Sequence, residues 1–209
     1  MAVTGLVFVG FILAHMYGNL MIFAGAAAFD EYAHHLRTFG APMLPQGGFL
    51  WVLRIGLVLS LVLHAGAAFI LWARAGRARQ TRYAVQRGQW ALFVKRSMRW
   101  GGVALLLFLV FHLLHFTTNT IQINGDYTSP AARLVSSFQV WWAVAIYAVA
   151  VLALGMHLLH GVWSMGMTLG LNKNLNAAER LRMAGIGVAA VVVVGFLLPP
   201  LAILFTLIP

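Results

Sequence analysis

The sequence predicts an all-α membrane protein whose 209 residues form a single domain (1–209), a bundle of five transmembrane helices. Composition is the first reason: 62% of the residues are hydrophobic and 9% are charged, whereas a soluble domain has about 45–50% apolar and 25% charged residues. The second is the presence of five apolar runs of the length, about 20 residues, that crosses a bilayer. These runs are expected to be helices, because lipid leaves an open chain no other way to satisfy its backbone hydrogen bonds.

The predicted spans take up most of the chain. They cover approximately residues 2–25, 49–73, 100–120, 138–168 and 183–208. The first is uncharged as far as Phe29, and Arg54 is the only charged residue within the second. The fifth contains Pro199 and Pro200. We expect these prolines to kink or break its last turns, because proline lacks an N–H and clashes with the preceding turn.

Basic residues are distributed unevenly between the two sides of the bundle. The loops between spans two and three and between spans four and five hold Arg74, Arg77, Arg79, Arg82, Arg87, Lys95, Arg96, Arg99, Lys173, Arg180 and Arg182. The two loops on the other side hold only Arg37 and Arg133, beside Asp30, Glu31 and Asp126. Since Lys- and Arg-rich loops stay in the cytoplasm, the sequence predicts an N-terminus inside and a C-terminus outside.

Charge and cysteine content exclude several classes of function. A formal net charge of +10 would indicate a nucleic-acid partner in a soluble protein, but here the basic residues set the orientation, so no such partner is expected. The chain has no cysteine, which excludes disulfides and thiolate-ligated iron–sulfur or zinc sites. No basic flank precedes the first apolar run. We therefore expect no signal peptide, and expect a short charged N-terminal piece to be absent from this sequence.

Histidine is the notable polar residue of the spans. Those within them are His15, His64, His112, His115, His157 and His160. Histidine at membrane depth is costly and by default marks a functional site. The predicted orientation places His15 and His112 toward the outside, and His64 and His157 in the inner half.

Two histidine pairs at two depths suggest a cofactor. Two neutral imidazoles from facing helices are what a six-coordinate haem iron needs. We therefore predict that His15 with His112 and His64 with His157 are metal ligands in an outer and an inner site. The plainer interpretation is that these histidines only form hydrogen bonds between helices.

The residues around His157 suggest room for a flat group. Gly161 and Ser164 follow it by four and seven residues, so all three share one helix face. His115 and His160 each follow a predicted ligand by three residues, on a neighbouring face. They are either the ligands instead, or partners of a haem propionate or a quinone oxygen, or partners of another helix.

Two arginines and two loop histidines have two interpretations each. Arg54, near the outer end of span two, pairs with an outer haem propionate or a quinone, or extends to the membrane interface. Arg99 opens span three on the inner side and either meets an inner propionate or serves as a topology anchor. His34 and His35 lie in the segment FDEYAHHLRTFG, a candidate short surface helix, and are expected on its wetted face.

The spacing of these residues resembles a known family. The matching patterns are His15-x-x-x-Asn19, His64-Ala65, Arg99 with His112 thirteen residues later, His157-x-x-x-Gly161-x-Trp163-Ser164, and AFDEYAHHL after span one. They resemble the cytochrome b membrane subunit of succinate dehydrogenases and fumarate reductases in its five-helix, two-haem form, over essentially the whole chain. In that family the first helix pairs with the third and the second with the fourth.

The resemblance implies a respiratory function. The chain would be the membrane subunit, not catalytic alone, of a succinate:menaquinone oxidoreductase of the tricarboxylic acid cycle, in the bacterial cytoplasmic (inner) membrane. Flavoprotein and iron–sulfur partner subunits would sit on the cytoplasmic face. Electrons would pass through the inner and then the outer haem b to menaquinone or another quinone, and the complex can form a higher oligomer. Some members carry intramembrane glutamates thought to move protons. The predicted spans contain no Asp or Glu, so that route is not expected here.

Two rival functions follow from the same residues. One is the cytochrome b subunit of another respiratory dehydrogenase or of a hydrogenase. The other is a metal or proton transporter that uses the two HxxH turns, although such proteins often show discontinuous helices or internal repeats, and spans one to four show neither. A bc-type cytochrome is disfavoured, because its ligands come two per helix at a wider spacing.

Overall fold

The fold is known from a computed structural model that describes residues 1–78, 89–125 and 127–208, without the side chains of 89–96. All regular structure in these ranges is helical. Five of the described helices are long and apolar enough to cross a membrane. The predicted all-α fold with five helices of membrane-spanning length and composition is therefore confirmed.

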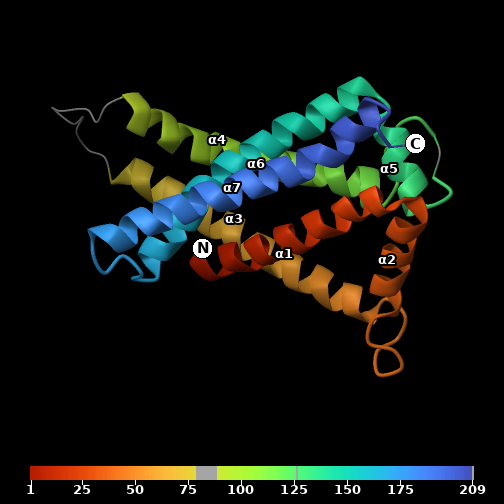
Figure 1. The fold of residues 1–209 in the computed structure, drawn as a ribbon. Coiled ribbons are helices and arrows are strands. Elements are labelled where there is room, and N and C mark those ends of the chain that lie inside the picture. Colours follow the sequence, from red (N-terminus) through yellow and green to blue (C-terminus); the bar gives the residue numbers. More distant parts are fainter. Residues whose placement is uncertain (79–88, 126, 209) are drawn as a thin grey trace.

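The long helices lie side by side and two short ones cover one end of the bundle (Figure 1). The long elements are α1 (Ala2–Leu20) with the 3-10 turn η1 (Met21–Ala24), α3 (Gly48–Arg77), α4 (Gln89–His112) with the π-helical turn η2 (Leu113–Thr117), α6 (Trp141–Thr168) and α7 (Leu175–Leu204). The short ones are α2 (Ala26–Thr38) and α5 (Pro130–Phe138), at the end where the C-terminus lies.

The fourth predicted span is shorter than the apolar run suggested. Helix α5 ends at Phe138, and α6 begins at Trp141 after Val140, whose backbone is extended (φ −98°, ψ 115°). The start of α5 is capped by Ser129, whose side chain accepts a hydrogen bond from the Ala132 N–H. The residues before 141 therefore form a separate helix that packs across the end of the bundle.

The fifth span runs through its two prolines. Pro199 and Pro200 are buried inside α7, which ends only at Leu204, so of the predicted kink or break the break is wrong. Neighbouring helices and local adjustments satisfy the backbone groups that a proline leaves free in a membrane helix. The helix also starts earlier than predicted and includes Glu179, which forms an exposed ion pair of 2.8 Å with Arg182.

Helix α6 is the centre of the bundle and packs against α1, α4 and α7. Its contact with α7 depends on glycine. A Cβ added at Gly155 would collide with Val193, and one at Gly185 would lie 2.6 Å from the Leu159 carbonyl oxygen. Close backbone approach of this kind drives helix association in lipid, where apolar burial alone gives little gain.

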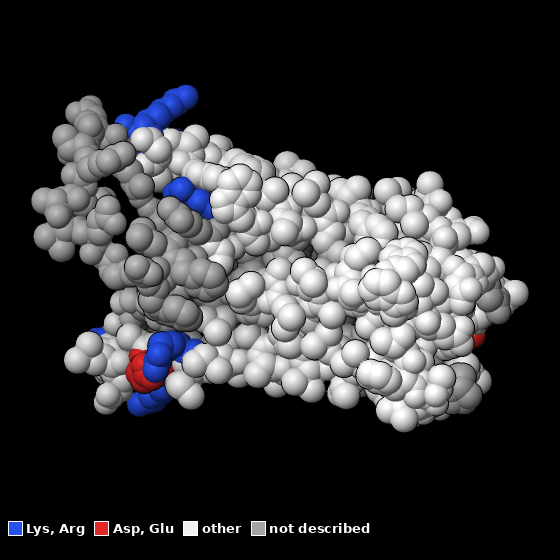
Figure 2. Space-filling model, turned by 90° about the horizontal axis from the view of Figure 1, so that it is seen from above, with Lys and Arg blue, Asp and Glu red and all other residues white. Residues whose placement is uncertain are grey.

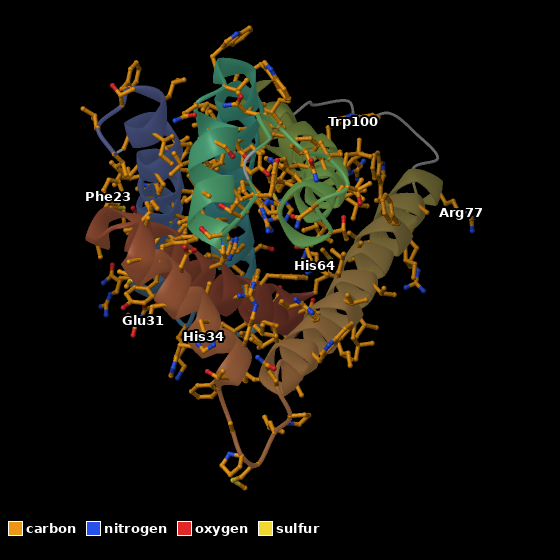
Figure 3. All side chains as sticks on the ribbon, turned by 90° about the vertical axis from the view of Figure 1, so that its right-hand side faces the viewer. Phe23, Glu31, His34, His64, Arg77 and Trp100 are labelled. Carbon is orange, nitrogen blue, oxygen red and sulfur yellow. The ribbon has the colours of Figure 1, made fainter. Side chains whose placement is uncertain are left out.

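Helix α3 is held differently. Its close contacts are mainly with α1 and α2, and none of its residues is buried. Figure 3 shows α3 at one edge of the bundle, with His64 directed to the interior and Arg77 at the far end. The helix is therefore exposed along much of its length, with His64 on the side that faces His157 of α6.

Charged side chains gather at one end of the molecule. Figure 2 shows them near the end of α3 and the start of α7, with an uncharged surface between the two ends in this view. Such a belt is what a hydrocarbon layer requires. Several residues used to predict orientation lie outside the described part: Arg79, Arg82, Arg87 and Asp126, and the side chains of Lys95 and Arg96.

Candidate paired-histidine sites

The structure brings four histidines together in two pairs. The ring centroids of His15 on α1 and His112 on α4 are 5.9 Å apart. Those of His64 on α3 and His157 on α6 are 6.3 Å apart. These are the two pairs that we expected from depth, and each one joins a different pair of helices.

The spacing within each pair suits one metal atom between two imidazoles. A metal bound at about 2 Å from an imidazole nitrogen lies about 3 Å from the ring centroid, so two opposed rings have centroids about 6 Å apart. The two rings are inclined by 83° in the outer pair and 56° in the inner pair. The centroid spacing of both pairs is therefore the one that two imidazole ligands of a single metal atom would have.

The two pairs lie at different heights in the bundle. At the inner level, His64 contacts Thr4 of α1, and the His157 ring lies against Gly102 of α4. The outer histidine of α1 follows Thr4 by eleven residues, and that of α4 follows Gly102 by ten. With a rise of about 1.5 Å per residue, both helices separate the levels by about 15 Å.

The side chain of His64 is bonded to α1 through its Nδ1 atom. The Thr4 hydroxyl donates to the Met1 carbonyl at 2.9 Å, so its oxygen can accept from His64 Nδ1, which lies 3.0 Å away. With the proton on Nδ1, Nε2 carries the lone pair. This is the arrangement in which a second polar contact fixes the tautomer and the direction of a histidine ligand.

His157 has an unmet polar atom. Its Nδ1 is buried and has no hydrogen-bond partner among the described residues. A buried polar atom without a partner is costly and calls for an explanation. A group bound from outside the chain would satisfy this atom only by bonding to Nδ1 itself.

The outer pair is supported by a buried polar network. His112 Nδ1 lies 3.3 Å from the Tyr147 hydroxyl. His115 Nδ1 lies 2.9 Å from the same hydroxyl, and His115 Nε2 lies 3.0 Å from Ser137 Oγ. Both ring nitrogens of His115 are therefore engaged within the chain. Sequence reasoning missed Tyr147 and Ser137, and the only available signal was a tyrosine hydroxyl inside an apolar span, which needs a partner when buried.

His15 lies among aromatic rings. Its ring stacks on Phe11 at 5.3 Å and lies 5.8 Å from Phe196 of α7. Asn19 donates to the His15 backbone carbonyl at 2.8 Å, and no described side chain bonds to the ring itself. The asparagine of the HxxxN pattern therefore stabilises the helix backbone and leaves both ring nitrogens of His15 available.

The other predicted residues of α6 lie along the helix after His157. A Cβ added at Gly161 would meet nothing within 4 Å, so this face has open space beside it. The ring of His160 lies 5.5 Å from Trp163, and the Ser164 carbonyl accepts from the Thr168 hydroxyl at 2.8 Å. The structure does not bring His160 or Ser164 into contact with the histidine pairs.

The two predicted arginines lie on aromatic rings near the ends of the spans. Arg54 is exposed, and its guanidinium lies 5.1 Å from the Trp51 ring centroid. Arg99 lies 5.3 Å from the Trp72 ring centroid and so links α4 to α3. The loop histidines His34 and His35 are exposed on α2, and Figure 3 shows His34 at the edge of the molecule.

Among the described residues, no potential metal ligands gather in groups larger than the two pairs. No group of three or more His, Asp or Glu side chains in the described ranges could hold a metal ion. A haem needs no more than two protein ligands, because the porphyrin supplies the other four nitrogens of a six-coordinate iron. Two histidines are therefore enough protein ligands for one haem, and His15, His112, His64 and His157 are the residues that would hold it.

Comparison with other proteins gives no further guide. No protein-family model, no curated protein and no solved structure matches the chain.

Proposed function

We propose that this chain is the membrane-anchor cytochrome b subunit of a succinate:quinone oxidoreductase, and that each histidine pair holds one haem b. The observation that carries the proposal is geometric. Two histidine pairs, at centroid distances of 5.9 and 6.3 Å, lie about 15 Å apart along the bundle axis. The sequence resemblance to the five-helix, two-haem family supports the same assignment.

The chain's own residues perform three tasks. Four imidazoles would ligate iron from α1, α3, α4 and α6. Thr4 and Tyr147 bond to the Nδ1 atoms of His64 and His112 and so direct the other nitrogen of each ring to the metal. The apolar helices exclude water from both levels. When bound, a haem supplies one-electron transfer between its ferric and ferrous states, at a potential set by ligation, burial and hydrogen bonding.

The partners follow from the orientation. Arg74 and Arg77 at the end of α3, with Lys173 before α7, mark the end of the bundle that the positive-inside rule assigns to the cytoplasm. The flavoprotein and iron–sulfur subunits would dock there, and a membrane quinone, menaquinone by resemblance, would accept the electrons. The location would be the bacterial cytoplasmic membrane.

The test is a pyridine haemochrome assay on the detergent-extracted complex, with identification of the subunits that purify with it. We expect two b-type haems per chain, together with a flavoprotein and an iron–sulfur subunit. A b-type spectrum with hydrogenase or formate dehydrogenase subunits would assign the chain to another respiratory enzyme. Absence of any b-type band would overturn the proposal and favour a transporter.

A further inference from the structure

A row of buried polar groups adjoins the outer pair. It runs from Ser137 through His115 and Tyr147 to His112, and will be called the tyrosine relay. Ser137 and His115 are fully buried, and Tyr147 is 7% exposed. Ligation needs only the last of these four residues. Because burying three further polar side chains is costly unless all their bonds are made, the relay calls for a role.

If His112 binds a metal through Nε2, the donor and the acceptor in each hydrogen bond of the relay are fixed. His112 Nδ1 then carries a proton and donates it to the Tyr147 oxygen. The one proton of the Tyr147 hydroxyl is left to donate to Nδ1 of His115. The proton of His115 therefore sits on Nε2 and is donated to Ser137 Oγ. The Tyr147 hydroxyl and both nitrogens of His115 then have partners, and reversing any one of these bonds reverses the others.

The backbone is adapted to the relay. His115 lies in η2, the π-helical turn that follows α4, where the Thr118 N–H donates to the Leu113 carbonyl at 2.9 Å. Such turns are rare and occur mostly at functional sites. His112, the last residue of α4, and His115 in this turn both reach Tyr147, with ring centroids 5.9 and 5.8 Å from it.

We propose that Tyr147 is a positioning residue for His112. Held by His115 and Ser137, its hydroxyl fixes the tautomer and direction of the His112 ring and strengthens this imidazole as an electron donor to the iron. The inference rests on the proposed function for the identity of the bound group. The inner pair has no such relay, since the Nδ1 of His157 is buried without a partner among the described residues.

The consequence is a difference between the two sites. An acceptor on the Nδ1–H of a histidine ligand raises the basicity of the ring, which stabilises the ferric state and lowers the midpoint potential. Removing the Tyr147 hydroxyl should therefore raise the potential of the outer haem and leave that of the inner haem unchanged. Tyr147→Phe removes one atom and keeps the ring that packs on Phe108 and Phe138, both at 5.0 Å.

The experiment is a redox titration of the purified complex, followed by absorbance and by the low-spin ferric signals in paramagnetic resonance. His15→Ala first identifies the outer haem as the one that is lost. Tyr147→Phe should then shift that haem's potential upward and change its resonance signal. Ser137→Ala should shift it in the same direction by less, because it acts through His115. Tyr32→Phe on α2 is the matched control and should change neither haem.

The outcomes separate the two proposals. A wild-type complex without haem would end the proposed function itself. Two haems whose potentials are unchanged in Tyr147→Phe, or shifted equally, would overturn the relay and leave the function standing. Loss of the outer haem alone from Tyr147→Phe would support the relay as the extreme form of the same effect. If that variant loses both haems, Ser137→Ala decides, and unchanged potentials in it would overturn the relay.

Discussion

The two histidine pairs differ in how firmly the surrounding chain holds them. The outer pair borders a buried cluster that includes Ile22, Leu134, Phe138 and Tyr147 and is tied to the tyrosine relay. The inner pair joins α6 to α3, a helix without a buried residue that packs mainly on α1 and α2. In lipid, burying apolar side chains between helices contributes little stabilisation. The packing of α3 on the rest of the chain therefore stabilises it only weakly. The inner site is therefore where bound cofactor and fold should depend on each other most.

The largest expected effect tests whether the pairs are separate sites. Replacing His64 or His157 with alanine should remove one haem, because an axial ligand is lost, and leave the other. Replacing His15 or His112 should remove the other one. The measurement is the haem-to-protein ratio together with the resonance signals of the remaining haem.

The control is His34→Ala, which changes an exposed histidine of α2 and should retain both haems. If the His64 and His15 variants lost the same haem, the pairing would be wrong. If all four ligand variants kept two haems, neither pair would be a haem site.

The second prediction sharpens the contrast between α3 and the rest of the bundle. Without haem, amide hydrogen exchange in α3 should increase far more than in α6. A ligand at a hundred times its dissociation constant stabilises by about 2.7 kcal/mol, so roughly hundredfold faster exchange is expected in α3. The measurement compares the complex from haem-deficient cells with the loaded one by mass spectrometry. Equal increases in α3 and α6 would mean that bound haem stabilises the two helices to the same extent.

Much of this arrangement followed from the sequence, because lipid imposes simple rules. Uncharged runs had to be helices, and single histidines at two depths gave both pairs before any coordinates. The ends of spans were less predictable. The run before α6 was apolar, yet Ser129 and Pro130 gave a helix-start signal that the span assignment overlooked. Hydropathy cannot separate a short apolar helix that caps a bundle from the beginning of a span.

The polar residues that bond to the paired histidines could not be predicted from the sequence. Tyr147 lies 35 residues from His112 along the chain, and tyrosines are also common at membrane interfaces. Only packing reveals that its hydroxyl meets two histidines. The sequence also did not predict that α7 begins as early as Leu175. Asn174 caps that helix by accepting from the Ala177 N–H at 2.8 Å, but the charged residues that follow lie outside any apolar run.

The third prediction compares two faces of α6. Gly155→Ala should destabilise the bundle by about 1–3 kcal/mol, because its Cβ would collide with Val193 and crowded cores lose stability in this range. Gly161→Ala should leave the fold intact, since its Cβ would meet nothing within 4 Å. Thermal unfolding of the purified complex measures both. Equal destabilisation by the two variants would contradict the close packing seen at Gly155.

The same pair of variants carries information about the inner haem. If a flat group lies against the face that holds His157 and Gly161, Gly161→Ala should weaken haem retention although the fold is unchanged. Haem content after extended dialysis in detergent measures this. Full retention would mean that the bound group does not reach Gly161.

The smallest expected effect concerns the hydrogen bond between Thr4 and His64 of the inner pair. Thr4→Val keeps the shape of the side chain but removes the oxygen 3.0 Å from His64 Nδ1. Loss of such a supporting contact lowers metal affinity by about tenfold at the weaker end. We therefore expect faster loss of the inner haem only, measured as its dissociation rate to apomyoglobin. Thr4→Ser, which keeps the hydroxyl, should behave like the wild type. If Thr4→Val left the dissociation rate of the inner haem unchanged, the inner pair would not depend on Thr4, and the difference between the two levels would have to come from α3 alone. Equally faster loss of both haems would show that the effect is not specific to the inner pair.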